Sequence, residues 1–213
     1  AYNDIINIHL TPGAPRRHNG CFTDMGSWMG FTLPEQAQPT TGFCGPYSIY
    51  YRHWYARSLV ALQGGTMWER SYCPGEVRMA LTLDGATIQE SLQFVDARTA
   101  LLTIDNPSKR QLVFSADSVS RKMQLSVDDG TVLIACHGGE RVMLLFPEPV
   151  RVAKAGHNYV ATVPEGMAHL TAAISIVMQD TEASVQQVHT ASLLANPEAS
   201  LKANEARWNG YLR

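Results

Sequence analysis

The chain has 213 residues, a formal net charge of -2 and 45% hydrophobic residues. This length suits one large domain, and the near-neutral charge provides no basic surface for nucleic acid or for an anionic membrane. No apolar run is long enough to span a bilayer, and the first ten residues lack the apolar core of a signal peptide. The location stays open: periplasmic or secreted if a leader has been removed, and cytoplasmic otherwise.

Residues 1–46 are predicted to form an irregular N-terminal arm that packs on the rest of the domain. Proline and glycine interrupt this stretch throughout, and no hydrophobic period lasts beyond a few residues. Within the arm, the aromatic segment CFTDMGSWMGFTLPE (residues 21–35) gathers three aromatic rings and two methionines around two glycines and Asp24. Irregular stretches of this length are usually functional or packed against another surface.

Residues 47–180 are predicted to form an antiparallel β-sandwich. Short runs alternate between apolar and polar residues, as at Val77, Met79 and Leu81, and residues 76–107 alone predict three strands. The dipeptides Asp84-Gly85 and Asp129-Gly130 are typical of tight hairpin turns. The predicted fold class is therefore mainly β, with short strands joined by hairpins.

Residues 181–213 are predicted to be a helical linker. The first helix is expected to bury an apolar stripe, and Pro197 suits the first turn of a second helix. The stripe consists of Val185, Val188, Leu193 and Leu194.

The second helix ends abruptly, with three apolar or aromatic residues in its last turns. These are Trp208, Tyr211 and Leu212. We expect them to form an exposed patch that a further domain covers, so that the chain is a piece of a longer protein.

The four cysteines are scattered without any close pair, which argues against a structural zinc site. They are Cys21, Cys44, Cys73 and Cys136. We favour four free thiols, most of them buried. A Cys21–Cys44 disulfide is the alternative, because these two residues flank the aromatic segment.

No catalytic constellation emerges from the sequence. The seven histidines form no ligand set, and neither a nucleophile elbow nor a phosphate-binding glycine loop is present. No two acids are recognisable as the facing pair that glycoside hydrolysis needs. We therefore expect no metal, no cofactor and no catalytic residue in this chain.

Four segments in order resemble bacterial members of glycoside hydrolase family 63. They are FTDMGSWMGFTLP, GFCGPYSIYY, LQFVDARTALLTIDN and the closing LANPEASLKANEARWNGYLR. The family comprises inverting, exo-acting α-glucosidases and relatives. The resemblance implies a β super-sandwich joined by a helical linker to an (α/α)6 barrel, and the barrel holds both catalytic acids. The partners implied are that C-terminal barrel and an α-glucoside oligosaccharide, and the chain alone should be inactive.

The same resemblance suggests that the aromatic segment lies where sandwich and barrel meet. Asp24, Trp28 and Phe31 are then the candidates for contact with substrate or barrel. Asp24 is suited to accept hydrogen bonds from a sugar hydroxyl or from backbone amides, and the alternative is that it caps its own turn. Trp28 is suited to cover a sugar or a barrel helix, and the alternative is that it is core.

Two rival functions remain. One is a module that binds carbohydrate by itself, through an aromatic platform built from Tyr47, Tyr50, Tyr51, Trp54 and Tyr55. Aromatic residues in a strand are more often cross-strand packing than a platform. The other is a sandwich that dimerises through the exposed face of the linker.

Overall fold

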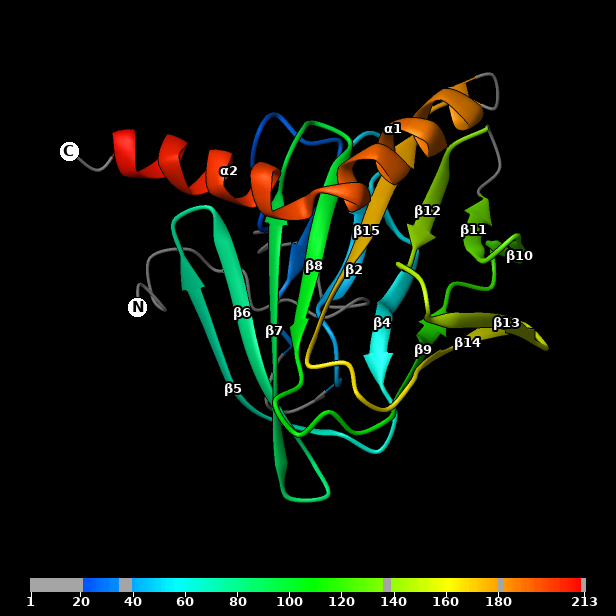
Figure 1. The fold of residues 1–213 in the computed structure, drawn as a ribbon. Helices are drawn as coiled ribbons and strands as arrows, with labels where there is room; N and C mark the ends of the chain where they lie inside the picture. The colour runs from blue at the N-terminus through cyan, green and yellow to red at the C-terminus, as the bar shows by residue number, and fades with distance from the viewer. Residues whose placement is uncertain (1–20, 35–39, 136–138, 180–181, 212–213) are drawn as a thin grey trace.

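The computed structural model describes residues 21–34, 40–135, 139–179 and 182–211. Within these ranges two β-sheets pack face to face, and two helices follow at the C-terminal end (Figure 1). The mainly β prediction is confirmed. None of the described helices is both long enough and apolar enough to cross a bilayer.

One sheet has the strand order β1-β2-β4-β9-β14-β13, with β3 paired to β2. Its strands are β1 (Met29–Thr32), β2 (Cys44–Ser48), β3 (His53–Trp54), β4 (Ala56–Leu62), β9 (Leu112–Val119), β13 (Arg151–Ala155) and β14 (Asn158–Val163). The pairs are antiparallel except for β2 and β4, which run parallel.

The other sheet has the order β10-β11-β12-β15-β8-β7-β6-β5, with every pair antiparallel. Its strands are β5 (Thr66–Cys73), β6 (Glu76–Leu83), β7 (Ala86–Phe94), β8 (Thr99–Asp105), β10 (Gln124–Asp128), β11 (Thr131–Ala135), β12 (Arg141–Leu145) and β15 (His169–Val177). We call its face toward the first sheet the inner face and the opposite face the outer face.

The hairpins form where the sequence predicts them. Asp84 and Gly85 join β6 to β7 with φ angles of 47° and 80°, and Asp129 and Gly130 join β10 to β11 in the same way. Positive φ at both central residues matches the twist of the flanking strands. The apolar residues of β6 and β7 consequently point to the inner face and enter one shared core.

The irregular-arm prediction for residues 1–46 is wrong for the part that the structure describes. β1 and most of β2 lie inside it, and both belong to the first sheet. Phe22 and Phe31 exchange backbone hydrogen bonds of 2.7 and 3.1 Å, and both rings pack on Phe94. The free energy gained by burying these apolar side chains outweighs the local preference for a loop that the prolines and glycines indicate.

The cysteine alternatives are resolved in part. Cys21, Cys44 and Cys73 are thiols, so the Cys21–Cys44 disulfide is wrong. Burial raises the pKa of the Cys21 thiol to about 11, which leaves it protonated and poorly nucleophilic. Cys136 lies outside the described residues.

Helices α1 (Ala183–Ala195) and α2 (Pro197–Tyr211) confirm that this part of the chain is helical and that a break precedes Pro197. The prediction that α1 buries its apolar stripe is wrong for two of the four residues. Val185 and Val188 face outward, and α1 buries Gln186 and Thr190 instead. These two polar side chains meet hydroxyl groups on the outer face: Gln186 Nε2 donates to Thr99 Oγ1 (3.1 Å), and the Thr190 and Ser175 hydroxyls lie 2.7 Å apart.

One carboxylate lies inside the sandwich. Glu90 projects from β7 to the inner face with only 2% of its surface exposed, and neither of its oxygens has a hydrogen-bond partner among the described residues. Burial raises its pKa to about 8, because ionisation in an apolar interior is costly. The Tyr159 hydroxyl, whose own pKa burial raises, shares this interior and donates to the Leu59 carbonyl oxygen (2.7 Å).

Candidate functional site

Most of the sequence-predicted site residues meet at one end of the sandwich, which we call the helix end. It comprises the loop of residues 21–28, the turns of residues 49–52 and 95–98, and helices α1 and α2. Figure 1 shows these elements together at the top of the molecule. Backbone hydrogen bonds tie them, since Trp28 donates to the Ala97 carbonyl oxygen and Ile49 donates to the Trp28 carbonyl oxygen, both at 3.0 Å.

Asp24 fastens the loop of residues 21–28 to α2. One carboxylate oxygen accepts from the Trp208 Nε1–H (2.9 Å) and from the Arg207 guanidinium, and the other accepts from the Met25 amide (2.8 Å). The Asp24 side chain is only 8% exposed, so this ion pair is largely shielded from water. Asp24 therefore both caps its own turn and binds α2. A sugar hydroxyl would have to compete with these bonds.

Trp208 also packs against the hairpin between β5 and β6. A Cβ added at Gly75 would lie 2.0 Å from Trp208 Nε1, and the φ of Gly75 is +79°. Only glycine permits both the backbone conformation and the approach of the indole. Trp208 is consequently half-buried and held from two sides, whereas Tyr211, one turn later, is exposed.

Trp28 is partly exposed to solvent and partly covered by a neighbouring side chain. Its ring is 38% exposed, and the Arg98 guanidinium lies 4.7 Å from the ring centroid. Arg98 in turn donates to Glu182 beside the start of α1 (2.6 Å). The ring thus links the aromatic loop to α1 and keeps one part open to an external contact.

The predicted aromatic platform is split by the fold. Tyr55 is buried, and the Tyr47 and Trp54 rings pack on each other across β2 and β3 at 5.0 Å. Tyr50 and Tyr51 lie on the turn between these strands and remain exposed, Tyr50 to 72%. Only two of the five rings, Tyr50 and Tyr51, are therefore available on the surface as a platform for a ligand.

Glu140, which sequence reasoning missed, lies beneath the turn of residues 49–52 in the interior and is linked to it through Ser48. Its fully buried carboxylate accepts hydrogen bonds from the Ser48 hydroxyl (2.9 Å) and the Tyr55 hydroxyl (2.5 Å). The Ser48 hydroxyl oxygen also accepts from the Tyr51 amide (3.0 Å). His53 Nε2 lies 3.5 Å from the carboxylate, and burial lowers the pKa of this imidazole against the pull of the Glu140 charge. The network holds the exposed turn in one conformation.

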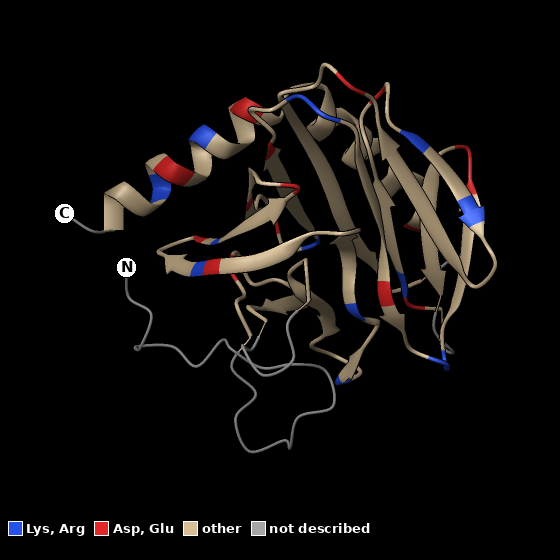
Figure 2. Ribbon diagram, turned by 90° about the horizontal axis from the view of Figure 1, so that it is seen from below, with Lys and Arg blue, Asp and Glu red and all other residues tan. Residues whose placement is uncertain are grey.

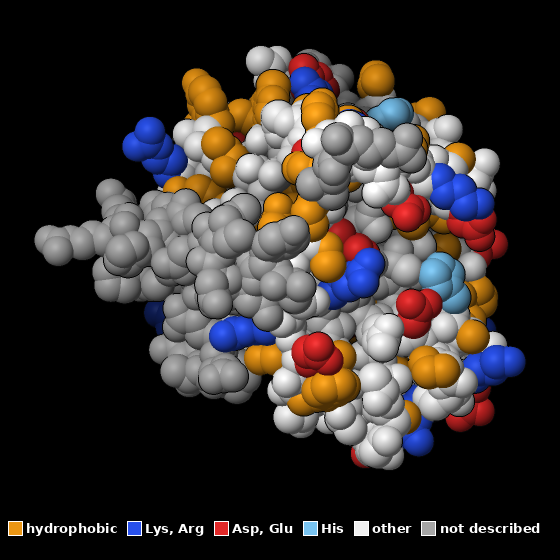
Figure 3. Space-filling model, turned by 90° about the vertical axis from the view of Figure 1, so that its left-hand side faces the viewer, with side chains coloured by type: hydrophobic (Ala, Val, Ile, Leu, Met, Phe, Trp, Pro, Cys, Tyr) orange, Lys and Arg blue, Asp and Glu red, His pale blue; other side chains and the backbone are white. Residues whose placement is uncertain are grey.

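The outer sides of the helices add apolar surface at the helix end. Val185 on α1 is 73% exposed and Val188 nearly as much, and Tyr211 on α2 is equally open. Figure 2 shows α2 running outward from the sheets with acidic and basic residues along it. Figure 3 likewise shows side chains of both signs interspersed on the face that it displays.

One sequence-predicted candidate does not reach the surface. Phe31 is 1% exposed and belongs to the core, so its assignment as a contact for substrate or another domain is wrong. Leu212 lies outside the described residues. Arg207 was overlooked although it precedes Trp208 in the quoted motif, whereas no sequence signal marks Glu140.

The acids of the helix end have structural partners. Asp24 and Glu140 are engaged as described, Glu182 binds Arg98, and Asp96 lies 2.9 Å from His189. Among the described residues, no group of three or more His, Cys, Asp or Glu side chains is arranged to hold a metal ion. Each of these carboxylates therefore helps to hold the elements of the helix end together.

No family model matches the sequence, and no curated protein does either. Among solved structures, a family 92 inverting mannosidase of Bacteroides thetaiotaomicron is similar, with a TM-score of 0.59 and 14% identity over 90% of this chain. The shared feature is the fold. A heparan sulfate lyase of Pedobacter heparinus has a TM-score of 0.39 and 12% identity over 79% of this chain. The chain spans about a third of the length of each enzyme, namely 33% and 32%.

Proposed function

We propose that the chain is the non-catalytic N-terminal β-sandwich of a glycoside hydrolase, and that its helix end docks on the catalytic domain. The observation that carries the proposal is the Asp24–Arg207–Trp208 junction, which fixes the direction of the linker helix relative to the sandwich. A linker that is clamped in this way presents the next domain in a defined orientation.

The exposed side chains around the junction support the same role. Apolar surface gathered on neighbouring elements is typical of a contact with another protein surface. Its members are Trp28, Ile49, Tyr50, Tyr51, Val185, Val188 and Tyr211. A β-sandwich of this fold also forms a third of an inverting mannosidase, in line with a non-catalytic domain within a larger enzyme.

We further propose that the enzyme is an inverting, exo-acting α-glucosidase of the family 63 type. This finer assignment rests on the four sequence segments that resemble that family. The substrate is then an α-glucoside oligosaccharide, and the catalytic acids reside in an (α/α)6 barrel that follows the linker.

The docking proposal is tested on the longer gene product with Val185→Asp and Val188→Asp combined. Val185 lies in the first turn of α1, where an acidic side chain suits the helix dipole, and Val188 is exposed, so α1 should still form. Burying two charges in an interface, in contrast, is costly. We expect two separate melting transitions in place of one and cleavage of the linker by limited proteolysis. Ala155→Asp, on an exposed edge strand, is the control and should behave as the wild type. Identical melting and proteolysis for both variants would contradict docking through α1.

A second candidate function is a self-contained module that binds carbohydrate or dimerises through the linker face. The exposed Tyr50 and Tyr51 on a rigid turn favour it. Light scattering of the isolated chain tests the dimer. If the chain dimerises and the double variant Val185→Asp, Val188→Asp is a monomer, the chain associates with itself through α1. A monomer at all concentrations would remove the dimerisation alternative.

A further inference from the structure

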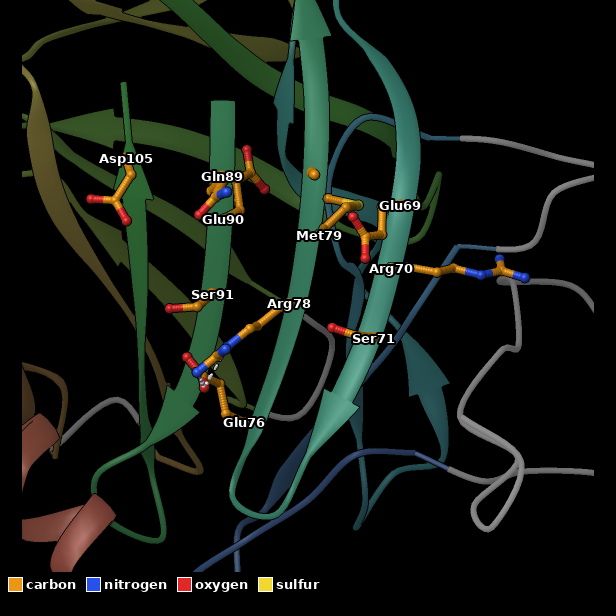
Figure 4. Close-up of a pocket in the computed structure, with 11 residues that line it drawn as sticks. Glu69, Arg70, Ser71, Glu76, Arg78, Met79, Gln89, Glu90, Ser91 and Asp105 are labelled. Atoms are coloured by element: carbon orange, nitrogen blue, oxygen red, sulfur yellow. Dashed lines mark hydrogen bonds and ion pairs between the residues drawn. The ribbon is translucent and has the colours of Figure 1, made fainter. Parts of the chain in front are cut away.

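The outer face of the larger sheet carries a trough away from the exposed side chains of the helix end. α1 covers the outer face over β12 and β15, where Met143, Leu145 and Val177 pack beneath it with Leu194. Over β5 to β8 the outer face holds a cavity of about 330 Å³, drawn in Figure 4. A second cavity of about 490 Å³ continues it toward α2, and the two share Glu76 and Arg78.

The side chains of the trough form cross-strand rows. Ser71 pairs with Arg78 across β5 and β6, and Arg78 pairs with Ser91 across β6 and β7. In the next row Gln89 of β7 lies opposite Asp105 of β8. Neighbouring strands are about 4.8 Å apart, so hydroxyl, amide and carboxylate groups recur at short, regular intervals. Such an array suits an extended ligand with many hydroxyl groups.

The central cation of the trough is fixed in place. Arg78 donates from Nε to Glu76 Oε2 (2.7 Å), and its Nη2 lies 2.5 Å from the same oxygen. The second oxygen of Glu76 accepts from Gln93 Nε2 (3.3 Å). Figure 4 shows the Arg78 side chain directed toward Glu76. The guanidinium keeps further N–H donors for a ligand, and holding it in advance reduces the entropy lost on binding.

An aromatic ring stands at the α2 side of the trough. Trp208 lines the second cavity, together with Gln93 and Asn204. The bond from its Nε1–H to Asp24 and the contact at Gly75 fix the orientation of the indole. A flat apolar ring beside amide and hydroxyl groups matches a sugar, which has apolar C–H faces and polar edges.

The charges select against an anionic ligand. Arg78 is neutralised by Glu76, and the first cavity adds the carboxylates of Glu69 and Asp105, of which Asp105 lies 2.6 Å from His169 Nδ1. In the second cavity Glu198 and Glu205 outnumber Lys202. Arg70 also lines the first cavity, but its guanidinium extends away from Arg78 and Glu76, past the edge of β5 (Figure 4). We infer that the trough binds a neutral oligosaccharide. The choice of a saccharide rests on the proposed function, whereas the preference for a neutral ligand rests on these charges.

The test is a titration of the isotope-labelled chain, followed by NMR, with three hexasaccharides. Maltohexaose and an α-linked mannohexaose are the neutral probes, and a heparin hexasaccharide is the anionic one. We expect amide shifts confined to β5–β8 and α2 with at least one neutral probe, and much weaker binding of the heparin probe. Gln89→Ala combined with Ser91→Ala removes two polar contacts and should raise the Kd about tenfold. Thr87→Ala, on the same face of β7 outside the trough, should leave the Kd unchanged.

Three outcomes would overturn the inference: no binding of either neutral probe, shifts at the turn of residues 49–52 in place of the trough, or equal or tighter binding of heparin. Matching melting temperatures of the variants and the wild type show that a loss of affinity is not a loss of fold. The result is independent of docking through α1, because Val185 and Val188 lie outside the trough and the titration needs no second domain.

Discussion

Glu90→Gln should stabilise the protein, and more strongly at high pH. The side chain is buried, no hydrogen-bond partner for it lies in the part of the chain that the structure describes, and burial raises its pKa to about 8. In the unfolded chain the same group titrates near its ordinary value of 4.5. Between these two values the folded state binds more protons than the unfolded state, so the free energy of unfolding falls as pH rises.

The magnitude follows from the width of this window. Each pH unit corresponds to about 1.4 kcal/mol, so the wild type loses about 3 kcal/mol between pH 4.5 and pH 7 from Glu90 alone. The loss reaches about 4 kcal/mol by pH 8 and levels off above that pH. Glutamine has the same shape and carries no charge, so Glu90→Gln should match the wild type near pH 4.5 and exceed it by these amounts at higher pH.

Urea unfolding at pH 4.5, 6 and 8, followed by tryptophan fluorescence, measures the effect directly. Glu69→Gln is the matched control, because Glu69 is an exposed carboxylate on the same sheet. That variant should keep the wild-type dependence on pH. If Glu90→Gln shows the same pH dependence as the wild type, the carboxylate is not the source of the loss and the argument from burial is wrong.

Three further predictions concern the helix end. Gly75→Ala should cost more than 1 kcal/mol of stability by thermal unfolding, because its Cβ would collide with the Trp208 ring and its φ is positive. Asp24→Asn should speed hydrogen exchange in the last turns of α2, since it removes the ion pair that holds the helix on the loop. Glu140→Ala should lower stability by about 2 to 4 kcal/mol in urea unfolding, because two buried hydroxyl groups lose their acceptor.

The first two of these predictions each have a control variant in α2. Gly210→Ala in α2 meets no atom within 4 Å and should be neutral or slightly stabilising. Glu205→Gln, exposed on α2, should leave the exchange of α2 unchanged. Equal effects of Gly75→Ala and Gly210→Ala, or of Asp24→Asn and Glu205→Gln, would contradict the junction. A Glu140→Ala variant as stable as the wild type would contradict the role of the buried network.

The strands and hairpins were predictable because they depend on local chemistry. Alternation in residues 76–94 and the Asp-Gly dipeptides determine face and turn without reference to distant residues. β1 was missed because four residues between glycines and prolines show no usable period. They form a strand only because β2 offers a pairing edge and Phe94 offers a packing surface.

The packing of α1 could not be foreseen for a related reason. An apolar stripe normally turns inward, yet the outer face beneath α1 presents the Thr99 and Ser175 hydroxyl groups. Gln186 and Thr190 pair with them, and Val185 is left outside. At the helix end, Asp24 and Trp208 were each selected from the sequence, but their contact spans 184 residues of chain. Glu140 gave no signal, since a single acid acquires its role only from the hydroxyl groups that the fold brings to it.

The central claim is that this sandwich serves a glycoside hydrolase without performing the chemistry. The most direct measurement is the hydrolysis of aryl α-glucosides and glucose disaccharides by the isolated 213-residue chain and by the longer gene product, with the anomer of the released sugar determined by NMR. The account predicts no turnover by the isolated chain and hydrolysis with inversion by the longer product. Turnover by the isolated chain that survives repurification, or a coding sequence that stops at residue 213, would contradict it.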